Sequence, residues 1–244
     1  MLLSIITVTK NNLAGLKTTE QSLKIQTNKD YEWIIIDGNS TDGTQEFLAT
    51  TNAQWISQPD DGIYDAMNKG ITRAQGDYVI FLNAGDALAT QDTVEHILQT
   101  ALEQNSDFLF GDSFERETSG ALHKKPVKKF TNTPKFMFTH HQSMIYRRGI
   151  IEDLRYDTNY KIAADYKFTY EFLQRSKTAY YIPKPICIFE SGGVSQTEAT
   201  TGRQEQFKIR EALNICTEGE NKIIYAVQSL RWAVRRFVPF LYWR

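Results

Sequence analysis

The stretch LLSIITVTKNN, residues 2–12, decides how the fold begins, because an apolar run rich in β-branched residues ends there at three polar ones. Such a run is typical of a central strand that is buried on both faces. Residues 13–27 follow with apolar side chains at helical spacing, and a second apolar run at 33–36 ends at Asp37. The sequence therefore predicts strand, helix and strand, the unit from which parallel sheets are built.

The same alternation continues along the rest of the chain, and we predict an α/β fold with a mixed, mainly parallel sheet flanked by helices. A strand at 180–189 contains Pro183 and Pro185, which favours a position at the sheet edge. The segment 113–135 has little periodicity, and we expect a mobile loop or an irregular hairpin. The other expected elements are helices at 44–50, 63–74, 93–104 and 164–174, and strands at 55–56, 78–82 and 107–111.

Acidic residues follow three of the predicted strands. Asp37, Asp86 and Asp112 each come where an apolar run stops. In parallel sheets, ligands bind beyond the carboxyl ends of the strands, so these side chains are expected to converge on a site. Each acid taken alone is also a common turn residue.

Composition excludes several classes of function. Hydrophobic residues make up 41% of the chain and charged residues 23%, and the formal net charge is -1, which disfavours nucleic acid as a partner. Cys187 and Cys216 are far apart and form no CxxC pair, so no cysteine-based zinc or redox site is expected. Buried, reduced thiols fit a reducing compartment.

The N-terminus has the pattern of a buried strand, without the charged flank of a signal peptide. No stretch approaches the ~20 apolar residues that a membrane span requires. We therefore expect a cytoplasmic protein, or one bound peripherally to the inner face of the cell membrane.

Four segments together resemble the family 2 glycosyltransferases of the GT-A fold: SIITVTKN, IIIDGNSTDGT, DGIYDAMNKGI and GDYVIFLNAGD. Their order and spacing match over residues 2 to about 90. A weaker match continues to about residue 195 through HHQSMIYRR, AADYKF and FESGGVS. The similarity is strongest to bacterial enzymes of exopolysaccharide, colanic-acid and O-antigen assembly. It implies transfer of a sugar from a nucleotide-diphosphate sugar, with UDP favoured, to a glycan or polyprenyl-diphosphate-linked acceptor.

The resemblance also implies a set of nucleotide-binding residues. Thr7 and Thr9 stand where the family holds the base, and Asp37 stands where it hydrogen-bonds base or ribose. Ser40 and Asp42 shape the same turn. The segment that lines the nucleotide and diphosphate contributes Asp61, Asn68 and Lys69.

The metal-binding DXD motif of the family corresponds to Asn83-Ala84-Gly85-Asp86, in which only Asp86 is a carboxylate. Because Mg²⁺ needs one or two carboxylates when a diphosphate supplies further oxygens, we expect weak or substrate-assembled binding of Mg²⁺ or Mn²⁺ through Asp86, with Asn83 as a weaker ligand. A metal-independent variant is the alternative. Lys69, Lys161 or the lysine-rich 124–129 segment would then neutralise the diphosphate.

Asp165 lies where the family has its catalytic base, which implies inversion at the anomeric carbon by a single displacement. An N-cap role is the alternative from the sequence. His140 and His141 cannot easily share one metal if the segment is extended, because neighbouring strand residues point to opposite faces. Contact of one histidine with the diphosphate or acceptor competes with a packing role.

Two further segments have open assignments. Gly193 lies in a turn that either closes over the donor or is a plain turn, and the lysine-rich segment is either a solvated loop or a lid.

Residues 222–244 contain five basic residues, many aromatic ones and no acid, which favours an amphipathic helix on anionic lipid. Docking on the protein core and self-association are the alternatives.

We divide the chain into a nucleotide-sugar-binding half at 1–112, an acceptor and catalytic-base half at 113–205 and a helical tail at 206–244. Three other functions were considered. A sugar nucleotidyltransferase would need a glycine-rich phosphate loop near the N-terminus, and a nicotinamide-dependent dehydrogenase would need GxGxxG after the first strand; neither is present. A catalytically inactive nucleotide-sugar-binding protein stays open because the DXD motif is reduced.

Overall fold

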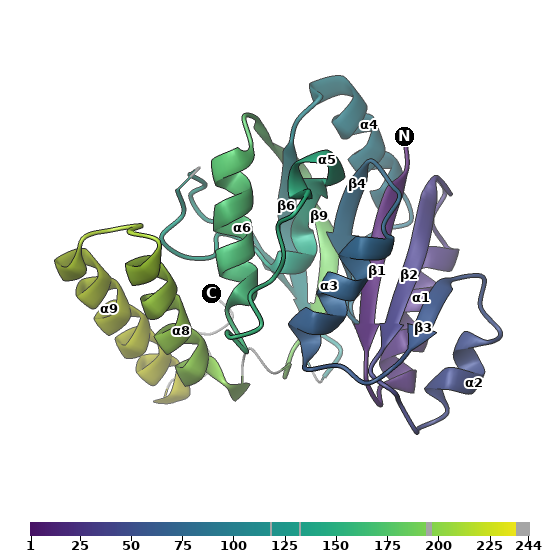
Figure 1. Ribbon diagram of the computed structural model, residues 1–244, viewed down its shortest axis with the longest axis horizontal. Coiled ribbons are helices and arrows are strands. Elements are labelled where there is room, and N and C mark those ends of the chain that lie inside the picture. The colour runs from purple at the N-terminus through teal and green to yellow at the C-terminus, as the bar shows by residue number, and fades with distance from the viewer. Residues whose placement is uncertain (118, 132, 194–196, 238–244) are drawn as a thin grey trace.

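The computed structural model describes residues 1–117, 119–131, 133–193 and 197–237, with side chains up to residue 234. These residues form one nine-stranded sheet with helices on both faces (Figure 1). The strands are β1 (Leu3–Thr9), β2 (Tyr31–Asp37), β3 (Gln54–Ser57), β4 (Tyr78–Phe81), β5 (Ala87–Leu88), β6 (Phe108–Arg116), β7 (Leu122–Lys125), β8 (Met144–Arg147) and β9 (Ala179–Glu190).

The helices alternate with these strands over most of the chain, as the sequence predicts. A short 3-10 helix, η1 (His141–Ser143), leads into β8. The α-helices are α1 (Leu13–Lys24), α2 (Thr44–Leu48), α3 (Ile63–Arg73), α4 (Thr93–Gln104), α5 (Arg148–Ile151), α6 (Ala164–Arg175), α8 (Ala199–Ala212) and α9 (Glu218–Phe237).

The sheet is mixed and mainly parallel, with the order β3-β2-β1-β4-β8-β6-β9-β5. Neighbours are parallel from β3 to β4 and again between β6 and β9, whereas β8 runs antiparallel between β4 and β6. The short β5 pairs antiparallel with β9, and β7 forms a hairpin with β6. The predicted fold class is confirmed.

Alternate side chains of the strands build two cores. Ile5 of β1 belongs to a cluster with α1 and α4 on one face, and its neighbour Ile6 belongs to a cluster with α3 and α6 on the other. Both side chains are fully buried. The sheet is therefore sealed on both faces, and the edge beyond the strand ends stays open for a site.

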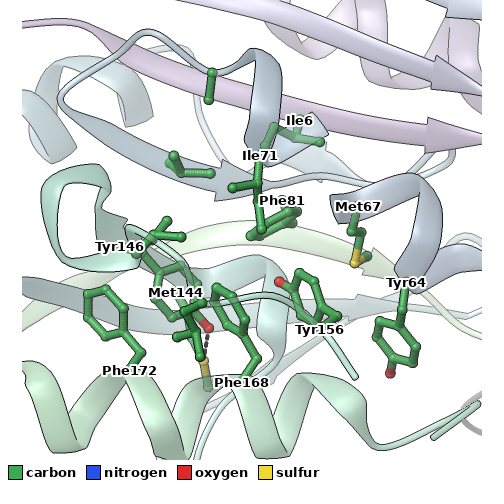
Figure 2. Close-up of a cluster of buried hydrophobic side chains, with 14 of the residues drawn as sticks. Ile6, Tyr64, Met67, Ile71, Phe81, Met144, Tyr146, Tyr156, Phe168 and Phe172 are labelled. Atoms are coloured by element: carbon green, nitrogen blue, oxygen red, sulfur yellow. Dashed lines mark hydrogen bonds between the residues drawn. The ribbon is translucent and has the colours of Figure 1, made fainter. Parts of the chain in front are cut away.

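An aromatic stack in the second core joins the sheet to the loop that precedes α6 (Figure 2). Tyr156 stacks on Phe168 with ring centroids 4.2 Å apart and meets Phe81 edge-on at 5.3 Å. Asn68 of α3 holds the same loop: its Nδ2 donates to the Tyr156 carbonyl at 2.9 Å, and the Tyr156 N–H donates to its Oδ1 at 2.8 Å. These contacts fix the path of the chain into α6.

The expectation that Asp112 ends a strand is wrong. Strand β6 continues to Arg116 because it pairs with β7 as well as with β8 and β9, so Asp112 lies within it. Its carboxylate accepts from the Val127 N–H and the Tyr181 hydroxyl, both at 2.9 Å, and pairs with Lys124. Asp112 therefore holds the irregular hairpin that the sequence predicts for this region.

The prediction that the proline-containing strand lies at the sheet edge is only partly right. Pairing of β9 with β6 shifts in register between Ile182 and Pro185, so the prolines lie at a bulge where ladder hydrogen bonds are interrupted. Beyond the bulge, β5 covers the outer side of β9 at Cys187 and Ile188.

Helices α8 and α9 lie side by side at the end of the molecule away from β3 (Figure 1). Ile209 of α8 packs against Ala163 and Tyr166 at the start of α6. None of the described helices is long and apolar enough to cross a membrane. The expected C-terminal helix is present as α9, but the part of the tail prediction that concerns Arg244, Phe240, Tyr242, Trp243 and the side chains of Arg235, Arg236 and Phe237 lies outside the described residues.

Truncation of the aromatic stack should destabilise the whole domain. Phe168 is fully buried and contacts Phe81, Tyr146 and Tyr156. We expect Phe168→Ala to lower the free energy of unfolding by about 3–5 kcal/mol, measured by urea denaturation. The control Leu102→Ala, at a side chain 73% exposed on α4, should change it by less than about 0.5 kcal/mol. Equal effects of the two changes would contradict this account of the core.

Candidate active site

A cleft of about 1540 Å³ opens beyond the carboxyl ends of β1 and β4 and extends toward α8 and α9. Five separate segments contribute its acidic side chains: the turn before α3, the loop after β4, the first turn of α6, the end of β9 and the N-cap of α8. Convergence at this sheet edge is what parallel topology favours. These acids are Asp61, Asp86, Asp165, Glu190 and Glu198.

The turn at 83–86 is hydrogen-bonded to the side chain of Thr19 in α1. The Thr19 hydroxyl donates to the Asp86 carbonyl at 2.7 Å and accepts from the Gly85 N–H at 3.1 Å. Gly85 has φ +108°, a conformation that glycine adopts without strain. The turn therefore presents the Asp86 side chain in a fixed orientation.

Asp86 is buried, with 4% of its surface exposed, at the floor of the cleft. Its Oδ1 accepts from the Glu190 N–H at 3.2 Å. Burial raises the pKa of Asp86 to about 7, hydrogen bonds from Glu190 and Gln142 oppose that rise, and the charge of Glu190 adds to it. A carboxylate in this setting gains from a cation, because a positive charge offsets the cost of desolvation.

Glu190 supplies a second carboxylate that the sequence did not reveal. Its Oε2 lies so close to Gly85 that a β-carbon there would stand 2.3 Å from it. Asn83 adds an Oδ1 that is buried and has no hydrogen-bond partner among the described residues. These oxygens suit Mg²⁺ or Mn²⁺ when a diphosphate completes the coordination, although no group of three or more His, Cys, Asp or Glu within the described residues is arranged to hold a metal alone.

Asp165 lies in the first turn of α6 and lines the cleft. It is not the N-cap, which is Ala163. Its Oδ1 accepts from the Tyr166 N–H at 2.8 Å and from the Tyr64 hydroxyl at 3.4 Å. Because the surrounding wall desolvates it, the pKa of Asp165 rises to about 6. A carboxylate with this pKa is ionised at neutral pH and basic enough to accept a proton.

The two histidines line the cleft but face different partners. His140 Nδ1 lies 2.6 Å from the Ser113 hydroxyl and its ring stacks on Phe189, whereas His141 Nε2 lies 2.8 Å from the Tyr156 hydroxyl. Burial lowers the pKa of His140 to about 4 and that of His141 to about 3, so both are neutral. Each histidine thus has its own hydrogen-bond partner, and contact of either one with the diphosphate or acceptor stays a prediction.

The predicted nucleotide set divides into two groups. Asp61 lines the cleft together with Asn83, Asp86 and Gly193. Seven other residues do not line it, and their nucleotide roles stay predictions. These are Thr7, Thr9, Asp37, Ser40, Asp42, Asn68 and Lys69.

Most of this second group has structural partners. The Asp37 carboxylate is fully buried and accepts from the Ser40 N–H and from the hydroxyls of Ser40 and Ser57. Thr7 Oγ1 accepts from the Trp33 indole N–H at 2.9 Å. Thr9 differs, because its buried Oγ1 has no partner among the described residues.

The remaining members fix the backbone around the cleft. Asp42 accepts from the Leu13 N–H at 2.9 Å and so joins the loop after β2 to the start of α1. Lys69 pairs with Asp65 at 2.8 Å and donates to the Pro59 carbonyl at 3.0 Å. Sequence spacing cannot distinguish such supporting roles from ligand contact.

Comparison with known proteins points to one family. The profile described as "Glycosyl transferase family 2" matches residues 4–155. A PGL/p-HBAD biosynthesis glycosyltransferase of Mycobacterium bovis is 31% identical over 211 residues, covering 80% of this chain and 79% of the relative. The poly(ribitol-phosphate) beta-N-acetylglucosaminyltransferase TarP of Staphylococcus aureus is 27% identical over 232 residues, covering 85% and 70%.

Solved structures share the fold. S. aureus TarS 1-349 in complex with UDP-GlcNAc superposes with a TM-score of 0.69 at 18% identity, covering 98% of this chain and 73% of TarS. The mannosyltransferase PcManGT from Pyrobaculum calidifontis, in complex with GDP-Man and Mn²⁺, gives 0.67 at 15% identity, covering 88% and 65%. With a family profile over more than half of its length, the chain belongs to glycosyl transferase family 2.

Proposed function

We propose that this protein is an inverting glycosyltransferase that moves a sugar from a nucleotide-diphosphate sugar to a hydroxyl of a glycan acceptor. One observation carries the proposal: Asp165 lines the same cleft as the Asp86 and Glu190 carboxylates. A base and a diphosphate-binding end in one cleft are the two parts that a single displacement requires. UDP is the favoured nucleotide, since TarS binds UDP and UDP-GlcNAc. GDP is the alternative, since PcManGT binds GDP-Man.

In this mechanism the Asp165 carboxylate takes the proton of the acceptor hydroxyl as the oxygen attacks the anomeric carbon. Tyr64 orients the base: its hydroxyl lies 2.7 Å from the Ile162 carbonyl and 3.4 Å from Asp165 Oδ1. At the other end, Asp86, Glu190 and Asn83 would hold a divalent cation, which stabilises the negative charge that develops on the leaving diphosphate. Lys128 and Lys161 also line the cleft and add positive charge.

We extend the proposal to a lipid-linked acceptor and to a peripheral position on the inner face of the cell membrane. Helix α9 exposes Ile223, Val227 and Leu230, with 65%, 43% and 66% of their surfaces accessible. Ile223 and Val227 also line the cleft, as does Arg231. A helix with apolar and cationic side chains next to an acceptor site fits an anionic lipid surface.

Removal of the base should abolish turnover without loss of donor binding. We expect Asp165→Asn to lower kcat about 10²–10⁴-fold, because the amide cannot take the proton. In the unchanged protein at saturating donor and Mn²⁺, where the cation would keep Asp86 ionised, kcat should rise with pH through about 6 and then level off, since only ionised Asp165 accepts a proton. Radiolabelled-sugar transfer measures both, with Asp30→Asn, at an exposed carboxylate, as control. Near-normal turnover of Asp165→Asn would reject Asp165 as the base, whereas nucleotide binding without any transfer by the unchanged protein would favour a catalytically inactive binding protein.

Removal of the Asp86 carboxylate should abolish the effect of the cation on nucleotide binding. UDP should raise the melting temperature of the unchanged protein further when Mn²⁺ is present, because a ligand of the folded state stabilises it. We expect Asp86→Asn to remove the Mn²⁺-dependent part of that rise and Glu190→Gln to reduce it. A Mn²⁺-independent rise with UDP in the unchanged protein would remove the cation from the proposal and leave the base intact.

Polar substitution on α9 should weaken membrane attachment. We expect Ile223→Ser combined with Leu230→Ser to lower binding to vesicles of anionic phospholipid about tenfold in a sedimentation assay, because two apolar side chains no longer enter the interface. The control Leu102→Ser changes a side chain of similar exposure on α4. Equal effects of the two changes, or no binding by the unchanged protein, would contradict membrane attachment through α9.

A further inference from the structure

The loop that leads into α6 is held by a carboxylate from a distant helix. Glu205 of α8 accepts hydrogen bonds from three consecutive backbone N–H groups: Lys161 at 2.8 Å, Ile162 at 2.8 Å and Ala163 at 2.9 Å. Only 9% of the Glu205 surface is exposed. Successive N–H groups that converge in this way form a concave anion site, here occupied by the protein's own side chain.

This arrangement replaces a local helix cap. Helix α6 begins after Ala163, whose side chain cannot accept a hydrogen bond, and no side-chain cap is present. Glu205 has no ion-pair partner among the residues that the structure describes. Its negative charge is therefore balanced mainly by backbone N–H groups and by the positive end of the α6 dipole.

The segment 161–163 lies directly before the base and contacts Tyr64, the residue that orients the base. Asp165 follows Ala163 by two positions, and the carbonyl of Ile162 accepts from the same Tyr64 hydroxyl that contacts Asp165. A shift of the 161–163 backbone would therefore move the Asp165 carboxylate and its contact with Tyr64 together. Misplacement of a reacting group by about 1 Å can cost roughly 10²-fold in rate.

Glu205 also acts on Asp165 by charge. Four ionisable side chains face Asp165: Tyr64 from α3, Tyr146 from β8, Tyr156 from the loop and Glu205 from α8. The tyrosines are neutral because burial raises their pKa, so Glu205 is the charged member of this set. Burial is the main reason that the pKa of Asp165 is raised, and the like charge of Glu205 adds to it.

We infer that Glu205 is a positioning residue for the transfer reaction, which fixes the catalytic base Asp165 through the backbone of residues 161–163. This inference rests on the proposed role of Asp165. It makes α8, which follows the residues matched by the family profile, part of the catalytic apparatus. Glu198 and Arg203 of the same helix line the cleft as well.

The test compares Glu205→Gln and Glu205→Ala with the control Glu211→Gln, at an exposed carboxylate of the same helix. Glutamine keeps one acceptor oxygen and the side-chain volume but removes the charge. We expect kcat to fall about 10-fold for Glu205→Gln and roughly 10²-fold for Glu205→Ala, with a smaller change in KM for the donor, because Asp86, Glu190 and Asn83 lie outside the segment that Glu205 holds. Glu211→Gln should match the unchanged protein.

A second measurement separates positioning from a purely structural role. The pKa of the Asp165 carboxyl, followed by ¹³C NMR in the folded protein, should be lower in Glu205→Gln than in the unchanged protein, and the acid limb of the pH–rate profile should shift the same way. Thermal melts show whether each variant is folded. A folded Glu205→Gln protein with unchanged kcat and unchanged Asp165 pKa, at reduced melting temperature only, would overturn the inference.

The NMR titration does not depend on turnover, so it also separates the two proposals. One possible result is a lowered Asp165 pKa in Glu205→Gln together with normal transfer by Asp165→Asn. This result would show that the two carboxylates are coupled but that Asp165 is not the base. Both the proposed role of Asp165 and the positioning role of Glu205 would then be overturned. Loss of transfer in Asp165→Asn with full transfer in Glu205→Ala would keep the proposed function and reject the inference alone.

Discussion

The stack of Phe81, Tyr156 and Phe168 is the contact on which the cleft depends. It joins the end of β4, the loop before α6 and α6 itself, which together carry the floor and one wall of the site. Tyr146 of β8 extends the same packing, because its ring contacts both Phe81 and Phe168. The Asn68 side chain completes the joint, because its two hydrogen bonds to Tyr156 satisfy backbone groups that would otherwise be buried without partners. The family resemblance implies that Asn68 binds the nucleotide, and in the structure its side chain supports one wall of the cleft.

The electrostatics of the cleft follow from burial. Asp86 and Asp165 are carboxylates whose charged forms are disfavoured by a low-dielectric wall, and both pKa values rise as a result. The two sites differ in what relieves that cost. Asp86 lies beside a second carboxylate, Glu190, whose repulsion a cation would relieve, whereas Asp165 is next to the Tyr64 hydroxyl and stays ionised at neutral pH. Our proposal therefore assigns diphosphate chemistry to the first acid and base catalysis to the second.

The C-terminal third contributes more to the site than its sequence suggests. Strand β9 supplies Glu190, and α8 holds the backbone next to Asp165 through Glu205. The proposed division of the chain does not follow structural boundaries, because β6 runs through residues 112 and 113 and α8 through residues 205 and 206. Residues on both sides of position 112 belong to one sheet, and residues from both parts line the cleft.

Local patterns in the sequence are enough to predict most of the alternating strands and helices, the parallel core, and Asp37 and Asp86 at the ends of apolar runs, because these depend on periodicity and on turn residues next to each other in the chain. The family resemblance implies the role of Asp165. Other features require the folded chain: Asp112 lies inside a strand, Glu190 lies beside Asp86, and Glu205 accepts from the loop before α6. The hydrogen bonds of Glu190 and Glu205 join residues 42 to 104 positions apart, and no local pattern specifies them, since they arise from the packing of a sheet whose strand order differs from its sequence order.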